Sequence, residues 1–359
     1  MSYETFFNSK AHQAEIQDLP LLRMLAARYK EERPFSGVRV VVGHLLVRNT
    51  MAVIEALISG GADLVIAEGH RTPAADIVID ELAQVGIAVL PNAEAVLQGD
   101  IFLDVNAVLG RLKTPQAAAE VTRTGILHYQ HIACPVVSAD DCKAKKIEGF
   151  YGTGDGFLRA WRQLKPEIPL EGKRLVQFGY GKIGRGAAFR TRAAGLEVIV
   201  ADVGESAQNR ARQDGFRVVG GQPNPELEQA LAQADIVIAV TSIPDILSRS
   251  IPAAWLRANN PALVNLGAQD EFGPNFADGE IVGGKAIPLN FHLANPTENR
   301  YVDAPLAAHV LALEALLKGD YKSGVHPLPP EMDDWLLENW RAQWPQEDLT
   351  GIGEELGLV

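Results

Sequence analysis

The chain of 359 residues contains few cysteines and no long apolar run. Cys134 and Cys142 are too few for a disulfide framework and lack the Cys/His spacing of a zinc site, so we expect two reduced structural thiols and no metal. The longest apolar runs, such as residues 236–240, are far shorter than the roughly 20 residues that span a membrane. The N-terminus also lacks the apolar core of a signal peptide, which predicts a cytoplasmic location without a membrane partner.

Positive charge is also scarce, because 33 Lys and Arg residues stand against 45 Asp and Glu residues and give a formal net charge of -12. A field of this sign repels a phosphate backbone, which argues against a nucleic-acid partner. The hydrophobic fraction of 47% and the charged fraction of 22% are typical of a folded globular protein. At roughly 150 residues per domain, the length predicts two domains.

The first 150 residues alternate short apolar runs with segments of helical spacing. Buried strands are predicted at residues 38–43, 62–66, 87–90 and 101–103, and helices at residues 50–59 and 74–85. A second series of the same kind begins at residues 173–178 and extends to about residue 289. This alternation predicts the α/β fold class, with two doubly wound parallel-sheet domains that carry helices on both faces.

The glycine content and the C-terminal pattern interrupt these two series. Residues 149–156 contain four glycines, which disfavours helix and strand alike, so we predict an interdomain hinge there. The C-terminal part combines an apolar helix at residues 305–318, a proline-rich turn, and a helix with Trp335, Trp340 and Trp344. Tryptophans at helical spacing are expected to cover the first domain or a subunit contact.

A glycine-rich motif opens the second series. A strand, a glycine-rich loop, a helix, a second strand and a terminal acid follow one another in the order that a dinucleotide-binding unit requires. The loop residues predicted to bind the cofactor are Gly179, Tyr180, Gly181, Lys182, Ile183 and Gly184. Asp202 is placed to accept hydrogen bonds from the adenosine ribose and to repel a 2′-phosphate. We therefore predict NAD as the cofactor, the alternative being a glycine-rich turn without a ligand.

Two later strands of the second series end in polar or small residues. Thr241 and Ser242 follow the fourth apolar run, and Gly267 ends the fifth. Because open parallel sheets bind ligands at the carboxyl ends of their strands, these residues are predicted to line the nicotinamide side. Asp270 and Glu271 follow directly, and since adjacent loop side chains usually diverge, a solvated surface pair is favoured there over a catalytic pair.

Four segments of the chain resemble the S-adenosylhomocysteine hydrolase family: residues 149–155, 172–186, 241–247 and 324–333. The resemblance implies a substrate domain at residues 1–150 to which residues 293–330 return, a Rossmann NAD-binding domain at 153–291, and a helical tail at 331–359. It also implies a small-molecule substrate and a homo-oligomer, either a dimer or a tetramer. In the chemistry of that family, bound NAD oxidises a ribose hydroxyl before a thioether is eliminated.

The resemblance also implies site residues in the first domain. Thr122 and Thr124 resemble the family's threonine run at the NAD site, with an arginine between them. Lys143 and Lys145, with Glu148 after one inserted residue, resemble a Lys-x-Lys-Phe-Asp segment whose lysine acts on the oxidised hydroxyl. From the residues alone, a solvated basic turn remains the alternative for this segment.

Other positions match the family in part. Asp104 resembles the first of two paired aspartates, and Asn290 resembles an asparagine near the nicotinamide. Asn295 stands where the family has a histidine before a proline, and His292, three residues earlier, is either an acid–base candidate or a structural histidine. Ala268 replaces a second family histidine, and the family's C-terminal lysine and tyrosine, which reach a neighbouring subunit's NAD site, have no match.

These departures favour a changed substrate and a shortened reaction cycle. We expect an NAD-dependent enzyme that oxidises a secondary hydroxyl of a small polar or nucleoside-like substrate and acts as a net oxidoreductase. Two alternatives remain from the sequence. One is a thioether hydrolase or lyase of the adenosylhomocysteine type with tightly bound NAD, and the other is a non-catalytic NAD-binding regulator.

Overall fold

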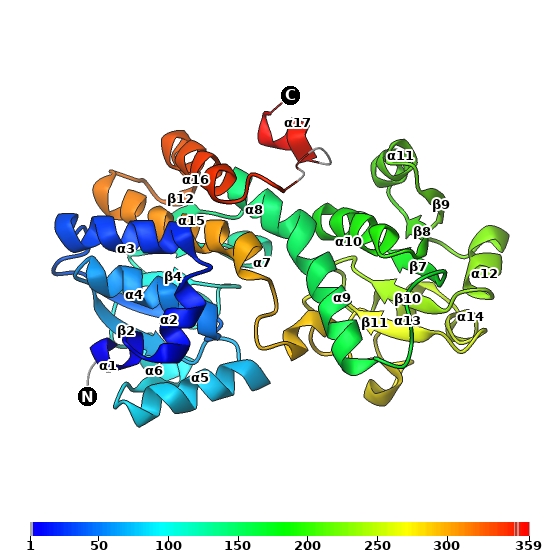
Figure 1. Cartoon of the computed structure of the whole chain (residues 1–359), viewed down its shortest axis with the longest axis horizontal. Helices are drawn as coiled ribbons and strands as arrows, with labels where there is room; N and C mark the ends of the chain where they lie inside the picture. The colour runs from blue at the N-terminus through cyan, green and yellow to red at the C-terminus, as the bar shows by residue number, and fades with distance from the viewer. Residues whose placement is uncertain (1–2, 348, 350–351, 359) are drawn as a thin grey trace. The chain divides into compact units, whose positions relative to one another are not determined.

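The computed structural model describes residues 3–347, 349 and 352–358. Contacts between Cα atoms divide the chain into unit 1, with residues 1–148 and 299–359, and unit 2, with residues 149–298. Figure 1 shows a sheet flanked by helices in each unit. The chain enters unit 1 for the second time through the long helix α15 (Asn299–Lys318).

Unit 1 is built on a seven-stranded parallel sheet. Its strands are β1 (Arg39–Gly43), β2 (Asp63–Ala67), β3 (Val89–Leu90), β4 (Ile101–Asp104), β5 (Ala117–Glu120), β6 (Pro135–Ser138) and β12 (Gly324–Pro327). The order across the sheet is β12-β6-β5-β4-β1-β2-β3, so the chain winds to one side after β1 and to the other side from β4 onward. The carboxyl ends of β1 and β4 therefore form the topological switch point, where such sheets bind ligands.

Helices pack on both faces of this sheet. They are α1 (Tyr3–Phe7), α2 (Lys10–Ile16), α3 (Pro20–Glu32), α4 (Met51–Ser59), α5 (Pro73–Gln84), α6 (Asn92–Ala95), α7 (Arg123–Tyr129), α8 (Lys143–Ile147), α15, α16 (Pro330–Gln343) and α17 (Gly353–Leu356). Val41, Phe102 and Ala118 share a core with α6 and α7, whereas α15 packs on β5 and β6. Trp340 of α16 is fully buried in the unit.

Unit 2 has a five-stranded parallel sheet in the order β11-β10-β7-β8-β9. Its elements are α9 (Thr153–Leu164), β7 (Arg174–Phe178), α10 (Lys182–Ala193), β8 (Glu197–Asp202), α11 (Glu205–Gln213), β9 (Arg217–Gly220), α12 (Pro225–Leu231), β10 (Ile236–Ala239), α13 (Ile246–Ser250), α14 (Ala253–Leu256) and β11 (Ala262–Asn265). Alternate strand residues face opposite cores, Leu175 with α9 and α10 and Val176 with α12 and α13. The predicted fold class, two doubly wound parallel-sheet α/β units, is confirmed, and the second switch point lies between β7 and β10.

The expectation that the glycines of residues 149–156 prevent helix formation is wrong. Residues 148–152 form one π-helical turn, and α9 continues through Gly154 and Gly156. A Cβ at Gly154 would lie 2.9 Å from Cβ of Arg190 in α10, and one at Gly156 would lie 2.8 Å from Cβ of Asn290. The glycines thus permit close packing of α9, and this packing outweighs their cost in a helix, about 1 kcal/mol each. The boundary between the two units still falls at residues 148 and 149.

None of the described helices combines the length and the apolar character that crossing a membrane requires.

Candidate functional site

The loop between β7 and α10 places the glycine motif at the switch point of unit 2. Gly179 has a φ of 101°, and a Cβ there would overlap the carbonyl oxygen of Val240. A Cβ at Gly184 would overlap the carbonyl oxygen of Gly179, so both positions require glycine. At Gly181, in contrast, no atom lies within 4 Å of the position that a Cβ would occupy. The backbone at the N-terminus of α10 therefore borders open space, as a pyrophosphate site requires.

Two side chains hold this loop. The amide nitrogen of Gln177, fully buried in β7, donates to the carbonyl oxygens of Gly179 at 2.9 Å and Gly184 at 2.7 Å. At the end of β8, the Asp202 carboxylate accepts from the Tyr180 N–H at 2.7 Å and from the Gly204 N–H at 2.8 Å. Each of its two oxygens has a second lone pair, which is the capacity that two ribose hydroxyls need. The residues present thus fit NAD.

The other motif residues divide by orientation. The Tyr180 side chain is 3% exposed and its hydroxyl donates to Asp214 at 2.8 Å, so Tyr180 contributes its backbone to the loop. Lys182 and Ile183 are exposed in the first turn of α10, beside Gly181. The open side of the loop therefore consists mainly of backbone N–H groups and the Lys182 stem, which suits an anion.

Replacement of Asp202 with alanine is expected to weaken NAD binding about tenfold, because hydrogen bonds to a charged group contribute about 1.5–3 kcal/mol. The preference for NAD over NADP should fall as well, since the charge that repels a 2′-phosphate is lost. Isothermal titration of the full-length chain with each dinucleotide measures both effects. Glu228→Ala, an exposed change on α12, is the control, and an unchanged NAD affinity in Asp202→Ala would contradict the assignment.

The three residues predicted for the nicotinamide side surround one carboxylate. Glu271 is fully buried, and its oxygens accept from the N–H and hydroxyl of Thr241 and from the N–H of Ser242. A Cβ at Gly267 would overlap Oε1 of Glu271. The expectation of a solvated Asp270 and Glu271 pair is therefore wrong. Burial raises the pKa of Glu271, although the three donors oppose this effect.

Residues 290–298 pack on α9 within unit 2. Asn290 is 2% exposed and donates to the carbonyl oxygen of Pro296 at 3.1 Å. The carbonyl oxygen of Asn295 accepts from Arg159 of α9 at 3.0 Å. His292 lies against Gly283, and its Nε2 is buried without a hydrogen-bond partner among the described residues. The contacts of Asn290 and Asn295 are structural, and the roles predicted for these three residues stay predictions.

In unit 1, α8 separates the two candidate lysines. The Lys143 ammonium is paired with Asp334 of α16, and this hydrogen bond raises the pKa of Lys143. Lys145 points inward and pairs with Glu148 at 2.8 Å, with 18% and 16% of the two side chains exposed. Burial alone would lower the pKa of Lys145, but Glu148, Asp140 and Cys142 outweigh burial and raise it. Lys145 is thus a shielded cation rather than part of a solvated basic turn.

Asp104 and Glu120 end neighbouring strands side by side and are both fully buried. Asp104 accepts from the Tyr129 hydroxyl at 2.7 Å and from backbone N–H groups, including that of Gly110 at 2.9 Å. Burial raises the pKa of both carboxyls, and the charge of Asp104 raises that of Glu120 further. Asp104 thus lies at the ligand-binding edge of the sheet while its oxygens hold the loop that follows β4.

The threonines of the predicted NAD run start a helix. Thr122 is the N-cap of α7: its hydroxyl oxygen accepts from the Gly125 N–H at 3.1 Å and its hydroxyl donates to Glu120 at 2.7 Å. Thr124 is half-buried in the first turn of α7. The Thr122 side chain is therefore committed to local structure, and contact of either threonine with NAD stays a prediction.

Sequence reasoning missed two histidines at the switch point of unit 1. His44 directly follows β1 and is 6% exposed, and His309 of α15 is fully buried, with 5.6 Å between the ring centroids. Burial lowers the pKa of His44 to about 4 and that of His309 to about 3. Each ring makes one contact, Nδ1 of His44 to the Leu45 carbonyl oxygen at 3.3 Å and Nε2 of His309 to the Ala119 carbonyl oxygen at 3.0 Å. Their other ring nitrogens are buried and unpartnered among the described residues.

The place of His44 after a predicted strand was a usable signal, because the end of the first strand lies at a switch point. His309 gave no signal, since one histidine in an apolar helix is usually structural. The loop after β4 adds Asn106, whose φ is 57° and whose side-chain amide lies 3.1 Å from Nε2 of His70. Three histidines and an asparagine thus gather near Lys145 and the two carboxyls.

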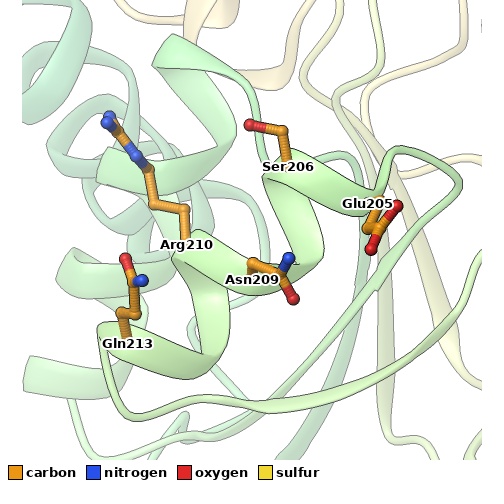
Figure 2. Close-up of a pocket in the computed structure, with 5 residues that line it drawn as sticks. All are labelled: Glu205, Ser206, Asn209, Arg210 and Gln213. Carbon is orange, nitrogen blue, oxygen red and sulfur yellow. The ribbon is translucent and has the colours of Figure 1, made fainter.

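Figure 2 shows an open polar pocket on the exposed face of α11, lined by Glu205, Ser206, Asn209, Arg210 and Gln213. None of the residues predicted from the sequence lines it, so it is not assigned to the site. Among the described residues, no three His, Cys, Asp or Glu side chains lie together in a way that could hold a metal ion.

The geometry of unit 2 defines a Rossmann-type NAD-binding domain, in a chain that also contains a second doubly wound α/β unit. Residues 150–271 match the family described as S-adenosyl-L-homocysteine hydrolase, NAD binding domain. The chain belongs to this superfamily as a divergent member, and NAD is its cofactor.

Relatives with assigned names agree with this placement. The chain is 30% identical over 266 residues to S-inosyl-L-homocysteine hydrolase of Methanocaldococcus jannaschii, covering 65% of this chain and 61% of that protein. It is 27% identical over 376 residues to adenosylhomocysteinase of a Nostoc species, covering 88% of this chain and 85% of that protein. The chain thus spans about three fifths of the first relative's length. A solved structure of dipicolinate synthase from Bacillus halodurans overlaps with 80% of this chain and 99% of its own, with 14% identity and a TM-score of 0.47.

Proposed function

We propose that the protein is an NAD-dependent enzyme that oxidises a secondary hydroxyl of a small polar or nucleoside-like substrate bound by unit 1. The observation that carries this proposal is the charge arrangement at the carboxyl edge of the unit 1 sheet. Two neutral imidazoles, His44 and His309, lie close enough to the Lys145 ammonium for its charge to lower their pKa values further. A cation beside unprotonated nitrogen is what the oxidation of an alcohol needs.

The residues of unit 1 divide the work of that step. The O–H proton of the substrate passes to an imidazole lone pair, for which Nε2 of His44 is our first choice because it has no other partner among the described residues. The Lys145 ammonium stabilises the negative charge that grows on the oxygen as the proton leaves, and Glu148 keeps that ammonium in place. Bound NAD supplies the hydride acceptor for the adjacent C–H, so that a carbonyl forms.

We further propose net oxidoreduction, in which NADH leaves after the step. The resemblance implies that family members cover bound NAD with a C-terminal segment of a neighbouring subunit. Here α17 packs on α8 of its own unit, as Figure 1 also shows, with Ile352 and Leu356 buried and the Lys146 ammonium donating to the Glu355 carbonyl oxygen at 2.8 Å. A segment held in this way cannot cover a cofactor elsewhere, which favours exchange of the dinucleotide.

The relatives named above favour a second candidate, hydrolysis of a thioether such as S-adenosylhomocysteine or S-inosylhomocysteine with NAD retained. In that reaction the oxidation is reversed within one cycle, so the products are a nucleoside and a thiol. The two candidates share the NAD site and the first oxidation and differ in whether NADH accumulates.

One assay separates them. The full-length chain is mixed with excess NAD and with adenosine, inosine or either thioether, while NADH absorbance and free thiol are followed together. Net oxidoreduction gives NADH beyond the amount of enzyme, and hydrolysis gives thiol without net NADH. If no substrate gives either product, the non-catalytic NAD-binding regulator gains and the proposal fails.

The activity should depend on Lys145. Lys145→Met is expected to lower turnover at least about 100-fold, as the loss of a group that stabilises charge or moves a proton does. Lys146→Met, on the same helix, is the matched control and should retain activity. Equal activity in both variants would remove Lys145 from the site. The homo-oligomer, a dimer or tetramer, is part of the same proposal, and sedimentation of the purified chain measures it.

A further inference from the structure

A buried carboxylate in unit 2 holds the loop that follows β10. Glu271 is fully buried, and its carboxylate accepts from the Thr241 N–H at 2.6 Å, from the Thr241 hydroxyl at 2.8 Å and from the Ser242 N–H at 2.7 Å. Gly267 makes room for this carboxylate, because a Cβ there would overlap Oε1. Four donor and packing features thus converge on one side chain that the sequence presents as an ordinary loop acid.

The loop adopts a backbone that needs such support. Ser242 has a φ of 62° and Asp245 a φ of 57°, values in the left-handed region that residues other than glycine rarely adopt. The segment carrying Glu271 also pairs with this loop through its own backbone, since the N–H of Asp245 donates to Asp270 at 2.8 Å and that of Leu247 to Glu271 at 3.0 Å. Glu271 therefore fixes the first half of the loop and its backbone carbonyl the second half.

This loop borders the cofactor site. Gly179 lies so close to Val240 that a Cβ would overlap the Val240 carbonyl oxygen, so the two loops touch at the switch point. Asp202, at the end of β8, is placed on the adenosine side of β7, and β10 is the neighbour of β7 on the opposite side. A dinucleotide that crosses the switch point must then place its nicotinamide half over the carboxyl end of β10.

We propose that Glu271 is a positioning residue for the nicotinamide half of NAD. It acts through Thr241 and Ser242, whose backbone conformation it sets, and it makes no contact with the cofactor itself. The Thr241 hydroxyl proton is committed to Glu271, so this side chain offers the cofactor only its remaining surface. The inference depends on the NAD-binding domain and is independent of the reaction proposed above.

The test compares whole NAD with its adenosine half. Full-length Glu271→Gln is titrated with NAD and with AMP, well below the melting temperature of the variant. The glutamine amide places an N–H donor where the carboxylate accepted, so at least one of three contacts is lost. NAD affinity is expected to fall about tenfold while AMP affinity stays within about twofold of the parent. Glu228→Gln, which removes an exposed charge on α12, should change neither affinity.

A purely structural role gives a different pattern. General loosening of unit 2 would weaken NAD and AMP equally, and a carboxylate without influence on the site would leave both unchanged; either result overturns the proposal. If Glu271→Gln does not fold, Thr241→Val removes one donor and leaves the buried carboxylate in place. This variant is expected to weaken NAD about threefold with AMP unchanged, and an unchanged NAD affinity would overturn the proposal as well.

Discussion

Glu120→Ala is expected to lower the free energy of unfolding of unit 1 by about 4 kcal/mol, the cost of removing one partner from a buried polar network. The Glu120 carboxylate accepts from the N–H groups of Ala107 at 2.9 Å, Val121 at 2.9 Å and Thr122 at 2.8 Å, and from the Thr122 hydroxyl at 2.7 Å. The substitution leaves all of these donors buried without an acceptor and opens a cavity beside them.

The loop after β4 adds to this cost. Asn106 and Ala107 have φ values of 57° and 52°, two successive left-handed residues without a glycine, and both of their N–H groups point to Glu120. Without the carboxylate the loop loses the contacts that hold this conformation. We therefore expect disorder of the loop in the variant even where the remaining sheet is intact.

Urea unfolding, together with hydrogen exchange of β4 and β5, measures this effect. Glu120→Gln keeps the volume and one acceptor oxygen and should lose about half as much stability as alanine does. Glu338→Ala, an exposed change on α16, serves as the control and should fall within about 0.5 kcal/mol of the parent. A loss below about 1 kcal/mol in Glu120→Ala would show that the loop has other supports.

The second large effect concerns acid stability. His309→Gln should retain about 2 kcal/mol more of its stability than the parent does when the pH falls from about 6.5 to about 4.5. Burial lowers the pKa of His309 to about 3, so the native ring stays neutral over this range while the unfolded ring, with its ordinary pKa, takes up a proton. The unfolded state therefore binds more protons, and the parent loses stability as the pH falls.

Other buried groups act in the opposite direction. Burial raises the pKa of Asp303 to about 7 and raises the pKa of Asp104 and Glu120 as well. These carboxyls hold protons in the native state that the unfolded state has released, so they stabilise unit 1 as the pH falls. Because they are present in parent and variant alike, the difference between the two proteins isolates His309.

Unfolding in urea at both pH values, for parent and variant, gives this difference directly. Glutamine keeps an N–H donor for the Ala119 carbonyl oxygen, which His309 contacts at 3.0 Å. His131→Gln, at an exposed position, is the matched control and should change the pH dependence little. Parallel pH profiles for parent and His309→Gln would show that His309 takes up its proton in the native state as readily as in the unfolded one.

The NAD-binding unit could be predicted because its signals are local. Between Gly179 and Asp202 the chain forms strand, loop, helix and strand without interruption, and each glycine has a backbone task that neighbouring residues impose. The parallel alternation of the first unit was predictable for the same reason. The strand Ala117–Glu120 was not, because three alanines carry no strand propensity and their burial depends on α15 from the far end of the chain.

Residues whose roles depend on distant partners escaped prediction or were misread. The glycines of residues 149–156 disfavour a helix in isolation, and only contact with α10 makes α9 stable. Glu271 reads as a solvated acid until the loop after β10 closes over it. Lys145 stands in a sequence typical of a basic turn, and its pairing with Glu148 requires that α8 bury one face.

By itself, the sequence determined the α/β class, the NAD-binding motif with its preference for NAD, and the superfamily, because hydrophobic period and glycine spacing act over a few residues. Only the tertiary structure decided which titratable groups are charged. The neutrality of His44 and His309, the raised pKa of Glu120 and the buried charge of Lys145 all depend on burial among segments far apart in the chain. Electrostatic energy depends on distance in space and on exclusion of water, and neither is written in the order of residues.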